Sequence, residues 1–331
     1  MSSEKINTPK VSIIVPVYNA GERFVKCMDT LVNQTLRDIE IILVLDCPTD
    51  GTDLIAKEYA SKDQRITVLE NSTNLHIGES RNRGIDIAKG EYIGFSDHDD
   101  YRELNMYEEL YSKAKENDSD VVLSWLENVE DIEMYLKTFG PNIYNKDFIL
   151  RDLIGFGYGS LTGNLFVRAV NCIYRRKMID SSGIKFVDTR NITPEDLIFQ
   201  IESINHSSRI DVVEKQFYYH VHHTENEGNK NSYISYEKRG EGLNYIYSYL
   251  KKEGIFETYK SDFYTGVTKQ FLMIISGTLY PHLLLKEFLR ARKRLRFYPF
   301  CKEAFRNYAL PSEKNKFKNR FVRKVLILLM R

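Results

Sequence analysis

The sequence predicts an α/β protein built on a doubly wound, mostly parallel sheet, and three observations support this prediction. Short segments that are almost entirely apolar alternate with longer segments of helical pattern. Polar residues rarely interrupt the apolar segments, which is typical of strands buried on both faces of a sheet. Several of these segments end in polar or acidic residues. Such alternation implies parallel strands joined by right-handed helical crossovers.

The first 125 residues contain the predicted sheet. In order, we expect a strand at 11–17, a helix at 22–34, a strand at 39–45, a helix at 50–61, a strand at 66–69, a helix at 77–88, and strands at 92–95 and 120–124. Pro16 lies at the end of the first strand, where its missing N–H group does least harm to strand pairing. Residues 1–125 are therefore predicted to form the nucleotide-binding half of the domain.

Beyond residue 125 the pattern is less regular. We expect a helix at 145–154, a glycine-rich loop at 155–163, an extended segment at 167–175, a helix from Pro194 to about 205, short strands at 210–213 and 216–221, and helices from 236 onward. The glycines match no phosphate-binding fingerprint, so a mobile loop is the favoured interpretation. We divide this part into a second half of the domain at 126–230 and a helical C-terminal region at 231–331.

The composition is that of a globular protein. Of the 331 residues, 42% are hydrophobic and 28% are charged, with a net charge of +1, which argues against disorder. The four cysteines show no CxxC spacing, so neither a zinc site nor a disulfide framework is predicted, and a reducing compartment fits. Residues 1–10 lack an apolar signal core, and no window has the roughly eighteen apolar residues of a spanning helix. We therefore expect a cytoplasmic protein without a signal peptide.

The stretch at 90–101 is the most informative, because an apolar strand ends abruptly in the carboxylates Asp97, Asp99 and Asp100. At the carboxyl edge of an open α/β sheet, such groups lie where ligands bind. In an extended chain, Asp97 and Asp99 project to one side and His98 to the other. Two facing carboxylates repel unless a cation lies between them, and hard oxygen donors suit Mg²⁺ or Mn²⁺. The alternative is a solvated turn in which Asp100 caps the following helix.

Five segments of the first hundred residues share a resemblance to one family. They are 11–19 (Val-Ser-Ile-Ile-Val-Pro-Val-Tyr-Asn), 33–35 (Asn-Gln-Thr), 39–51, 74–84 with its Arg-Asn-x-Gly run, and 90–100 (Gly-Glu-Tyr-Ile-Gly-Phe-Ser-Asp-His-Asp-Asp). With these segments in register over about ninety residues, the chain resembles glycosyltransferase family 2, a group of inverting nucleotide-sugar transferases with the GT-A fold. A weaker match continues at 171–175, 194–196 and 218–222.

The resemblance implies a nucleotide-sugar donor, with a UDP-sugar favoured, and it assigns residues to the nucleotide. Pro16 and Tyr18 would flank the uridine, and Asp46 would accept a hydrogen bond from the imide of the base. Arg81 would reach the nucleotide from the other side. The segment at 45–48 (Leu-Asp-Cys-Pro) lacks one acid and the Gly-Ser pair that are usual there, which leaves the selectivity for the base open.

The resemblance also places the acidic run against the donor and a divalent ion. Asp97 would contact the ribose or the sugar, and His98 belongs to the same donor-binding group. Asp99 would ligate the Mn²⁺ or Mg²⁺ ion that bridges the diphosphate, in agreement with the charge argument. His222 falls where the family often has a histidine near the metal or the diphosphate; the alternative is a surface histidine on an edge strand.

Transfer with inversion requires a base, because the acceptor hydroxyl must lose its proton as it attacks the anomeric carbon. The family supplies this base from an acid pair, which corresponds here to Glu195 and Asp196 after Pro194. We predict Asp196 as the base, with Glu195 as the second candidate. The alternative is that both acids only cap the helix and complement its dipole.

The C-terminal residues 314–331 combine basic residues with an apolar stripe at helical spacing. The stripe is formed by Phe317, Phe321, Val325 and Leu328. We predict a helix that lies on an anionic membrane surface, because cations beside an apolar stripe attract anionic headgroups. The alternative is a helix that packs on the catalytic domain. Nucleic-acid binding is not expected, because no recognition fold is present.

Together, these observations predict an inverting, metal-dependent glycosyltransferase. It would move a sugar from a nucleotide-diphosphate donor to a saccharide or lipid-linked acceptor, as in the synthesis of surface polysaccharides, at the cytoplasmic face of the membrane. Two alternatives remain: a catalytically inactive binding subunit of the same fold, and a sugar nucleotidyltransferase, which would release pyrophosphate.

Overall fold

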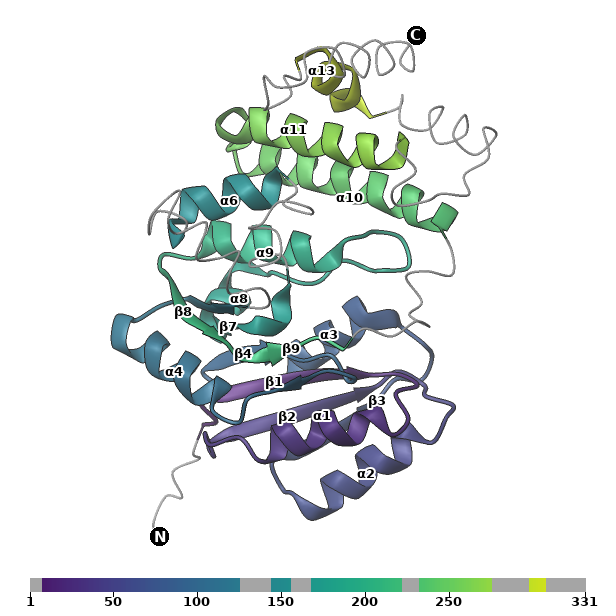
Figure 1. Ribbon diagram of the computed structural model, residues 1–331, viewed down its shortest axis with the longest axis vertical. Helices are drawn as coiled ribbons and strands as arrows, with labels where there is room; N and C mark the ends of the chain where they lie inside the picture. Colours follow the sequence, from purple (N-terminus) through teal and green to yellow (C-terminus); the bar gives the residue numbers. More distant parts are fainter. Residues whose placement is uncertain (1–7, 126–143, 156–167, 222–231, 276–297, 308–331) are drawn as a thin grey trace. The chain divides into compact units, whose positions relative to one another are not determined.

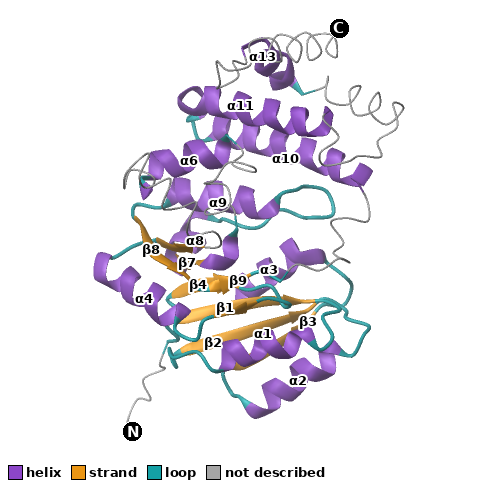
Figure 2. Cartoon of the chain, in the orientation of Figure 1, coloured by secondary structure: helices purple, strands orange, loops and turns teal. Residues whose placement is uncertain are grey.

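The computed structural model describes residues 8–125, 144–155, 168–221, 232–275 and 298–307 (Figure 1, Figure 2). The chain divides into two compact units. The first consists of Met1–Leu150, Asn164–Arg190 and Glu195–Thr224, and the second of Arg151–Gly163, Asn191–Pro194 and Glu225–Arg331. Each unit is described here by itself.

The first unit is built on a seven-stranded sheet with the order β3-β2-β1-β4-β7-β6-β8. The strands are β1 (Val11–Val17), β2 (Ile39–Leu45), β3 (Ile66–Glu70), β4 (Tyr92–Phe95), β6 (Val121–Trp125), β7 (Cys172–Arg175) and β8 (Ile210–Gln216). All pairings are parallel except those of β7, which runs antiparallel to β4 and β6. Every residue of β1 is buried, as expected for a strand covered on both faces. The doubly wound, mostly parallel sheet predicted from the sequence is confirmed.

The helices of the first half follow the predicted alternation. They are α1 (Arg23–Val32), α2 (Thr52–Lys62), α3 (His76–Ile87) and α4 (Met106–Asn117). Figure 1 shows α1 and α2 on one side of the sheet and α3 on the other. Right-handed crossovers explain this arrangement, because the chain steps from β1 to β2 to β3 in one direction and then returns to β4 on the far side of β1. The order therefore reverses between β1 and β4, which is where open α/β sheets bind ligands.

Helix α3 lies very close to β1, and Gly84 makes this possible. A Cβ atom at this position would come within 2.3 Å of Ile14 Cγ2. A larger residue would therefore push α3 away from the sheet. The close packing fixes Arg81, one turn earlier on α3, against the interior of the first unit, where its side chain is 1% exposed.

The remaining elements of the first unit differ in detail from the prediction. The segment at 167–175, expected to be extended, forms a short 3-10 helix η2 (Ala169–Asn171) before β7. Asn171 accounts for this, because its side-chain amide bonds the backbone of Ser124 and thereby fixes the entry into the sheet. The predicted strand at 216–221 is limited to β9 (Tyr218–Tyr219), which pairs with β5 (Tyr101–Arg102). Helices α8 (Arg176–Ser182) and α9 (Glu195–His206) complete this part.

The second unit contains long helices, as predicted. They are α10 (Ser232–Lys252), α11 (Phe256–Ile275) and α13 (Pro299–Asn307), and α6 (Lys146–Ile154) enters this unit at Arg151. Aromatic rings form its core: Tyr247 lies 5.0 Å from Phe256 and 5.1 Å from Phe300, measured between ring centroids. Among the described residues, no helix is both long and apolar enough to cross a membrane. The predicted surface helix at 314–331 lies outside the described residues.

Candidate active site

Polar side chains gather at the carboxyl edge of the sheet in the first unit, beside the point where the strand order reverses. Tyr18 follows β1, Asp46 follows β2, and Asp97 lies two residues after β4. The N-terminus of α9 contributes Glu195 and Asp196. Five of the residues predicted from the sequence therefore come from adjacent strand ends and from one helix start of the same unit.

Asp46 is held in place by the N-terminus of α3. Its Oδ1 accepts hydrogen bonds from Asn71 Nδ2 (2.6 Å) and from the backbone N–H of Leu75 (2.7 Å), and its Oδ2 accepts from the N–H of His76 (2.8 Å). A carboxylate has about four acceptor positions, of which these bonds use three. Asp46 is 4% exposed. These three bonds leave one acceptor position of the carboxylate, on Oδ2, for a further donor.

Pro16 and His98 are in direct contact. The backbone carbonyl of Pro16 lies 3.0 Å from His98 Nδ1. Because a carbonyl oxygen only accepts, the Nδ1 atom of His98 carries the proton and donates it. Tyr18, also predicted to bind the donor, is half-buried at the end of β1. The ends of β1 and β4 are thereby tied together at the predicted nucleotide site.

The acidic run does not continue β4 as an extended chain. The backbone turns at His98 and Asp99, so the expectation of an extended chain there, with Asp97 and Asp99 on one side and His98 on the other, is wrong. The buried Ser96 hydroxyl bonds the backbone carbonyl of Asp97, which helps to set this turn. Burial raises the pKa of Asp99; His98 lowers it, whereas the charges of Asp100 and Asp97 raise it further.

The residues present fit a divalent cation at Asp99. A half-buried carboxylate beside two others is stabilised by a positive charge, and carboxylate oxygen is a hard ligand of the kind that Mg²⁺ and Mn²⁺ prefer. Within the described part of the chain, no three His, Cys, Asp or Glu side chains are gathered as a ready-made metal site. Magnesium bound to a nucleotide usually takes only one or two carboxylates and completes its shell with phosphates and water. His222, the second predicted ligand, lies outside the described residues.

Asp100 has a structural role that could not be predicted from the sequence. It does not cap α4, whose N-cap is Asn105, so that alternative is wrong. Its side chain is fully buried and accepts hydrogen bonds from Tyr218 Oη (2.8 Å) and the backbone N–H of Val221 (2.8 Å), with His220 Nδ1 at 3.2 Å. The same Tyr218 hydroxyl accepts from the backbone N–H of Asp97 at 3.0 Å. Asp100 therefore fixes the segment around β9 against the acidic turn.

Arg81 joins the acidic turn to the acid pair of α9. Its Nη2 donates to Asp97 Oδ1 at 2.9 Å, and its Nη1 donates to Asp196 Oδ1 at 2.5 Å. Glu195 Oε1 lies 3.9 Å from the same Nη1 atom. The side chains of Glu195 and Asp196 are each 19% exposed, so solvent and ligands can reach them. The predicted contact of Arg81 with the nucleotide stays a prediction.

Both carboxyl groups of the acid pair have raised pKa values. Burial raises the pKa of Glu195 to about 7, with a further contribution from the charge of Asp196, while Arg81 opposes the shift. Burial also raises the pKa of Asp196, and Arg81 again opposes the shift. A pKa raised in this way brings a carboxyl group closer to the range in which a general base takes up and releases a proton.

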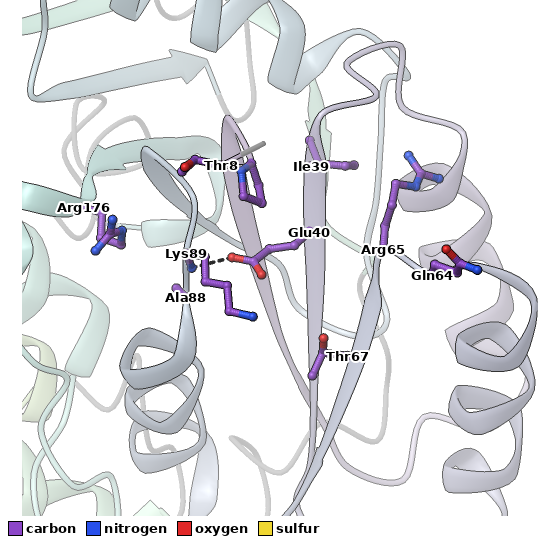
Figure 3. Close-up of a pocket in the computed structure, with 10 residues that line it drawn as sticks. Thr8, Ile39, Glu40, Gln64, Arg65, Thr67, Ala88, Lys89 and Arg176 are labelled. Atoms are coloured by element: carbon purple, nitrogen blue, oxygen red, sulfur yellow. Dashed lines mark hydrogen bonds between the residues drawn. The ribbon is translucent and has the colours of Figure 1, made fainter. Parts of the chain in front are cut away.

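A separate pocket lies at the opposite edge of the sheet (Figure 3). It is lined by residues at the amino ends of the strands, including Ile39 at the start of β2 and Lys89 shortly before β4. Glu40, which also lines it, accepts hydrogen bonds from the hydroxyl of Ser12 and the backbone N–H of Lys89. None of the predicted site residues lines this pocket.

Comparisons with known proteins identify the family and the fold of the chain. The family model described as "Glycosyl transferase family 2" matches residues 12–180. The chain is 36% identical to Glycosyltransferase GlyG of Streptococcus pneumoniae over 143 residues, which are 43% of this chain and 46% of GlyG, so the match spans about half the length of that relative. It is 29% identical to the cholesterol galactosyltransferase of Borreliella burgdorferi over 84% of this chain and 80% of that protein. The structure of S. aureus TarS 1-349 in complex with UDP-GlcNAc superimposes with a TM-score of 0.70 at 21% identity, covering 97% of this chain and 89% of TarS 1-349.

Proposed function

Because the chain belongs to glycosyltransferase family 2 and has the GT-A fold, we propose that it transfers a sugar, with inversion, from a UDP-sugar to a saccharide or lipid-linked acceptor. One observation carries this proposal. At the carboxyl edge of the sheet, Arg81 connects Asp97, on the donor side, with Asp196, a candidate base. Donor binding and proton removal are the two tasks that an inverting transfer requires of the protein.

Asp46 would recognise the nucleotide base. Its Oδ2 atom has one acceptor position left, and the imide N–H of uracil is a single donor of the required kind. Pro16 and Tyr18, at the end of β1, would flank the uridine. A uracil specificity is supported further by TarS, a protein of the same fold whose structure was solved with UDP-GlcNAc.

Asp97 and His98 would contact the ribose or sugar part of the donor, and Asp99 would hold a divalent ion together with His222. Bound Mn²⁺ or Mg²⁺ would neutralise the charge that develops on the leaving diphosphate. The side chain of Asp97 is 27% exposed, so it can receive hydroxyl donors while it keeps its bond to Arg81. The backbone bond from Asp97 to Tyr218 keeps this carboxylate in position.

Asp196 would accept the proton of the acceptor hydroxyl as that hydroxyl attacks the anomeric carbon. Its contact with Arg81 fixes the direction of the carboxylate, and its partial exposure leaves one side open to the acceptor. Glu195 is the second candidate because its pKa, at about 7, suits proton transfer near neutral pH. Glu195 also brings a second negative charge close to Asp196. This charge favours the binding of one proton by the two carboxylates.

The basic C-terminal residues 314–331 would bring the enzyme to an anionic membrane surface, which suits a lipid-linked acceptor. We expect the full chain to cosediment with vesicles that contain anionic lipid, and a chain that ends at Pro311 to remain in the supernatant. Equal cosedimentation of two folded proteins would contradict this assignment. Loss of folding on truncation would favour the alternative that the helix packs on the domain.

Donor screening tests the proposal as a whole. We expect one or more UDP-sugars to give time-dependent release of UDP in the presence of Mn²⁺, and we expect other nucleotide sugars to give less. Release of pyrophosphate in a reaction of a nucleoside triphosphate with a sugar phosphate would instead identify a nucleotidyltransferase. Binding of UDP without turnover of any donor or acceptor would identify a catalytically inactive binding subunit.

A further inference from the structure

The side chain of Arg81 is buried and is fixed by contacts with several other residues. Its side chain is 1% exposed, and its guanidinium carbon lies 4.9 Å from the centre of the Phe186 ring. Burial disfavours its charge, but the carboxylates of Asp196 and Asp97 raise its pKa, so the guanidinium stays protonated. The buried charge is therefore stabilised by these two acids, one from the acidic turn and one from α9.

The guanidinium of Arg81 is enclosed by the protein and donates to two carboxylates. One terminal nitrogen donates to Asp196 and the other to Asp97. The third nitrogen, Nε, is buried and has no hydrogen-bond partner within the described structure. These bonds use two of the five N–H groups of the guanidinium. Because the side chain is only 1% exposed, a phosphate or a nucleobase could reach the other N–H groups only if the residues around Arg81 moved.

We propose that Arg81 is a positioning residue for Asp196. It acts on this catalytic general base and does not bind the nucleotide. This inference rests on the proposed function of Asp196 as the base. The two terminal nitrogens of Arg81 form a rigid fork, so they fix the distance and orientation between Asp97, on the donor side, and Asp196, on the acceptor side. A misplacement of a catalytic group by about 1 Å can cost about a hundredfold in rate.

Arg81 also favours the ionised form of Asp196. Its positive charge opposes the rise in the pKa of Asp196 that burial causes. The other groups that face Asp196 are Asp97 after β4, Glu195 on its own helix, Arg168 before η2, and the buried Cys172 and Tyr174 of β7. Arg168 acts in the same direction as Arg81, but among these groups the stronger effect is that of Arg81, which contacts the carboxylate directly.

The first test compares Arg81→Gln and Arg81→Lys with the wild-type protein. For Arg81→Gln, we expect kcat to fall by about ten- to a hundredfold, with the affinity for UDP changed by about threefold or less. The acid limb of the kcat–pH profile should move to higher pH, because Asp196 loses the neighbouring positive charge. Arg81→Lys keeps the charge but not the fork, so it should restore the position of the acid limb and only part of kcat. If Arg81→Gln does not fold, Arg81→Lys still tests the inference.

Arg65→Lys is the matched control. Arg65 also donates to an aspartate through two nitrogens, Nε and Nη2 to Asp63, but this pair lies at the opposite edge of the sheet. We expect its kcat and its pH profile to equal those of the wild type. A fall in kcat for this variant as large as that for Arg81→Lys would assign the loss to general destabilisation and overturn the inference.

A double-mutant cycle separates this inference from the proposed function. If Arg81 acts through Asp196, adding Arg81→Gln to Asp196→Asn should lower kcat by about twofold or less beyond Asp196→Asn alone. Additive losses, or a loss of UDP affinity of about tenfold or more with an unchanged pH profile, would overturn the positioning role and make Arg81 a donor ligand, while Asp196 would remain the base. Wild-type turnover in Asp196→Asn alone would overturn both.

Discussion

Asp196→Asn is expected to lower kcat by about two to four decades, while the affinity for the donor stays nearly unchanged. A base acts only as the hydroxyl loses its proton, so its removal takes away stabilisation of the transition state and not of the bound donor. The asparagine side chain has nearly the same shape and can still accept the hydrogen bond from Arg81 Nη1. The local structure should therefore persist in the variant.

Glu195→Gln is the matched control on the same helix. We expect it to cost less in kcat than Asp196→Asn, and we expect the acid limb of the pH profile to move to lower pH, because a group whose pKa is raised to about 7 has been removed. Turnover, UDP affinity and melting temperature should be measured on all three proteins. If Glu195 is the base, kcat falls more in Glu195→Gln than in Asp196→Asn. If both acids only cap α9, both variants lose stability and activity in proportion.

Removal of the metal should weaken UDP binding strongly. Without a cation, the diphosphate would approach the carboxylates of the acidic turn directly, and like charges in a half-buried site repel each other. We expect chelation to reduce the affinity for UDP by about tenfold or more, as measured by titration calorimetry with Mn²⁺ and with a chelator. Asp99→Asn should reproduce this loss in the presence of Mn²⁺.

Asp118→Asn controls for the loss of one negative charge. Asp118 is 89% exposed and pairs with Arg175, at the amino edge of the sheet. Its backbone is left-handed, with φ of 54°, a conformation that asparagine tolerates well. This variant should bind UDP as the wild type does. Equal UDP affinity with and without Mn²⁺ in the wild-type protein would rule out the metal role of Asp99.

The sheet could be predicted from the sequence because each of its central strands has a local signal. The nearly continuous apolar runs of β1 and β2 follow from burial on both faces, and each run ends in the polar residues that lie at the carboxyl edge. The entry of β7 between β4 and β6 had no such signal, because its neighbours in the sheet lie far away in the sequence. Its antiparallel direction depends on tertiary packing.

The strand ends and the helix start that carry the proposed site residues could be predicted, but the contacts between these residues could not. Arg81 and Asp196 are 115 positions apart, and Asp100 and Tyr218 are 118 apart, so no local pattern links them. The assumption of an extended chain at Asp97 and Asp99 failed for a related reason. The turn there is set by contacts with other elements, such as the bond from His98 to the carbonyl of Pro16.

The most direct test of the central claim is the anomeric configuration of the product. Once a UDP-sugar with an α-linkage supports turnover, the new glycosidic bond can be assigned by proton NMR, and UDP can be measured in the same reaction. A single displacement assisted by Asp196 predicts a β-linked product and one UDP for each bond formed. An α-linked product would contradict direct attack by the acceptor, and with it the role of Asp196 as the general base.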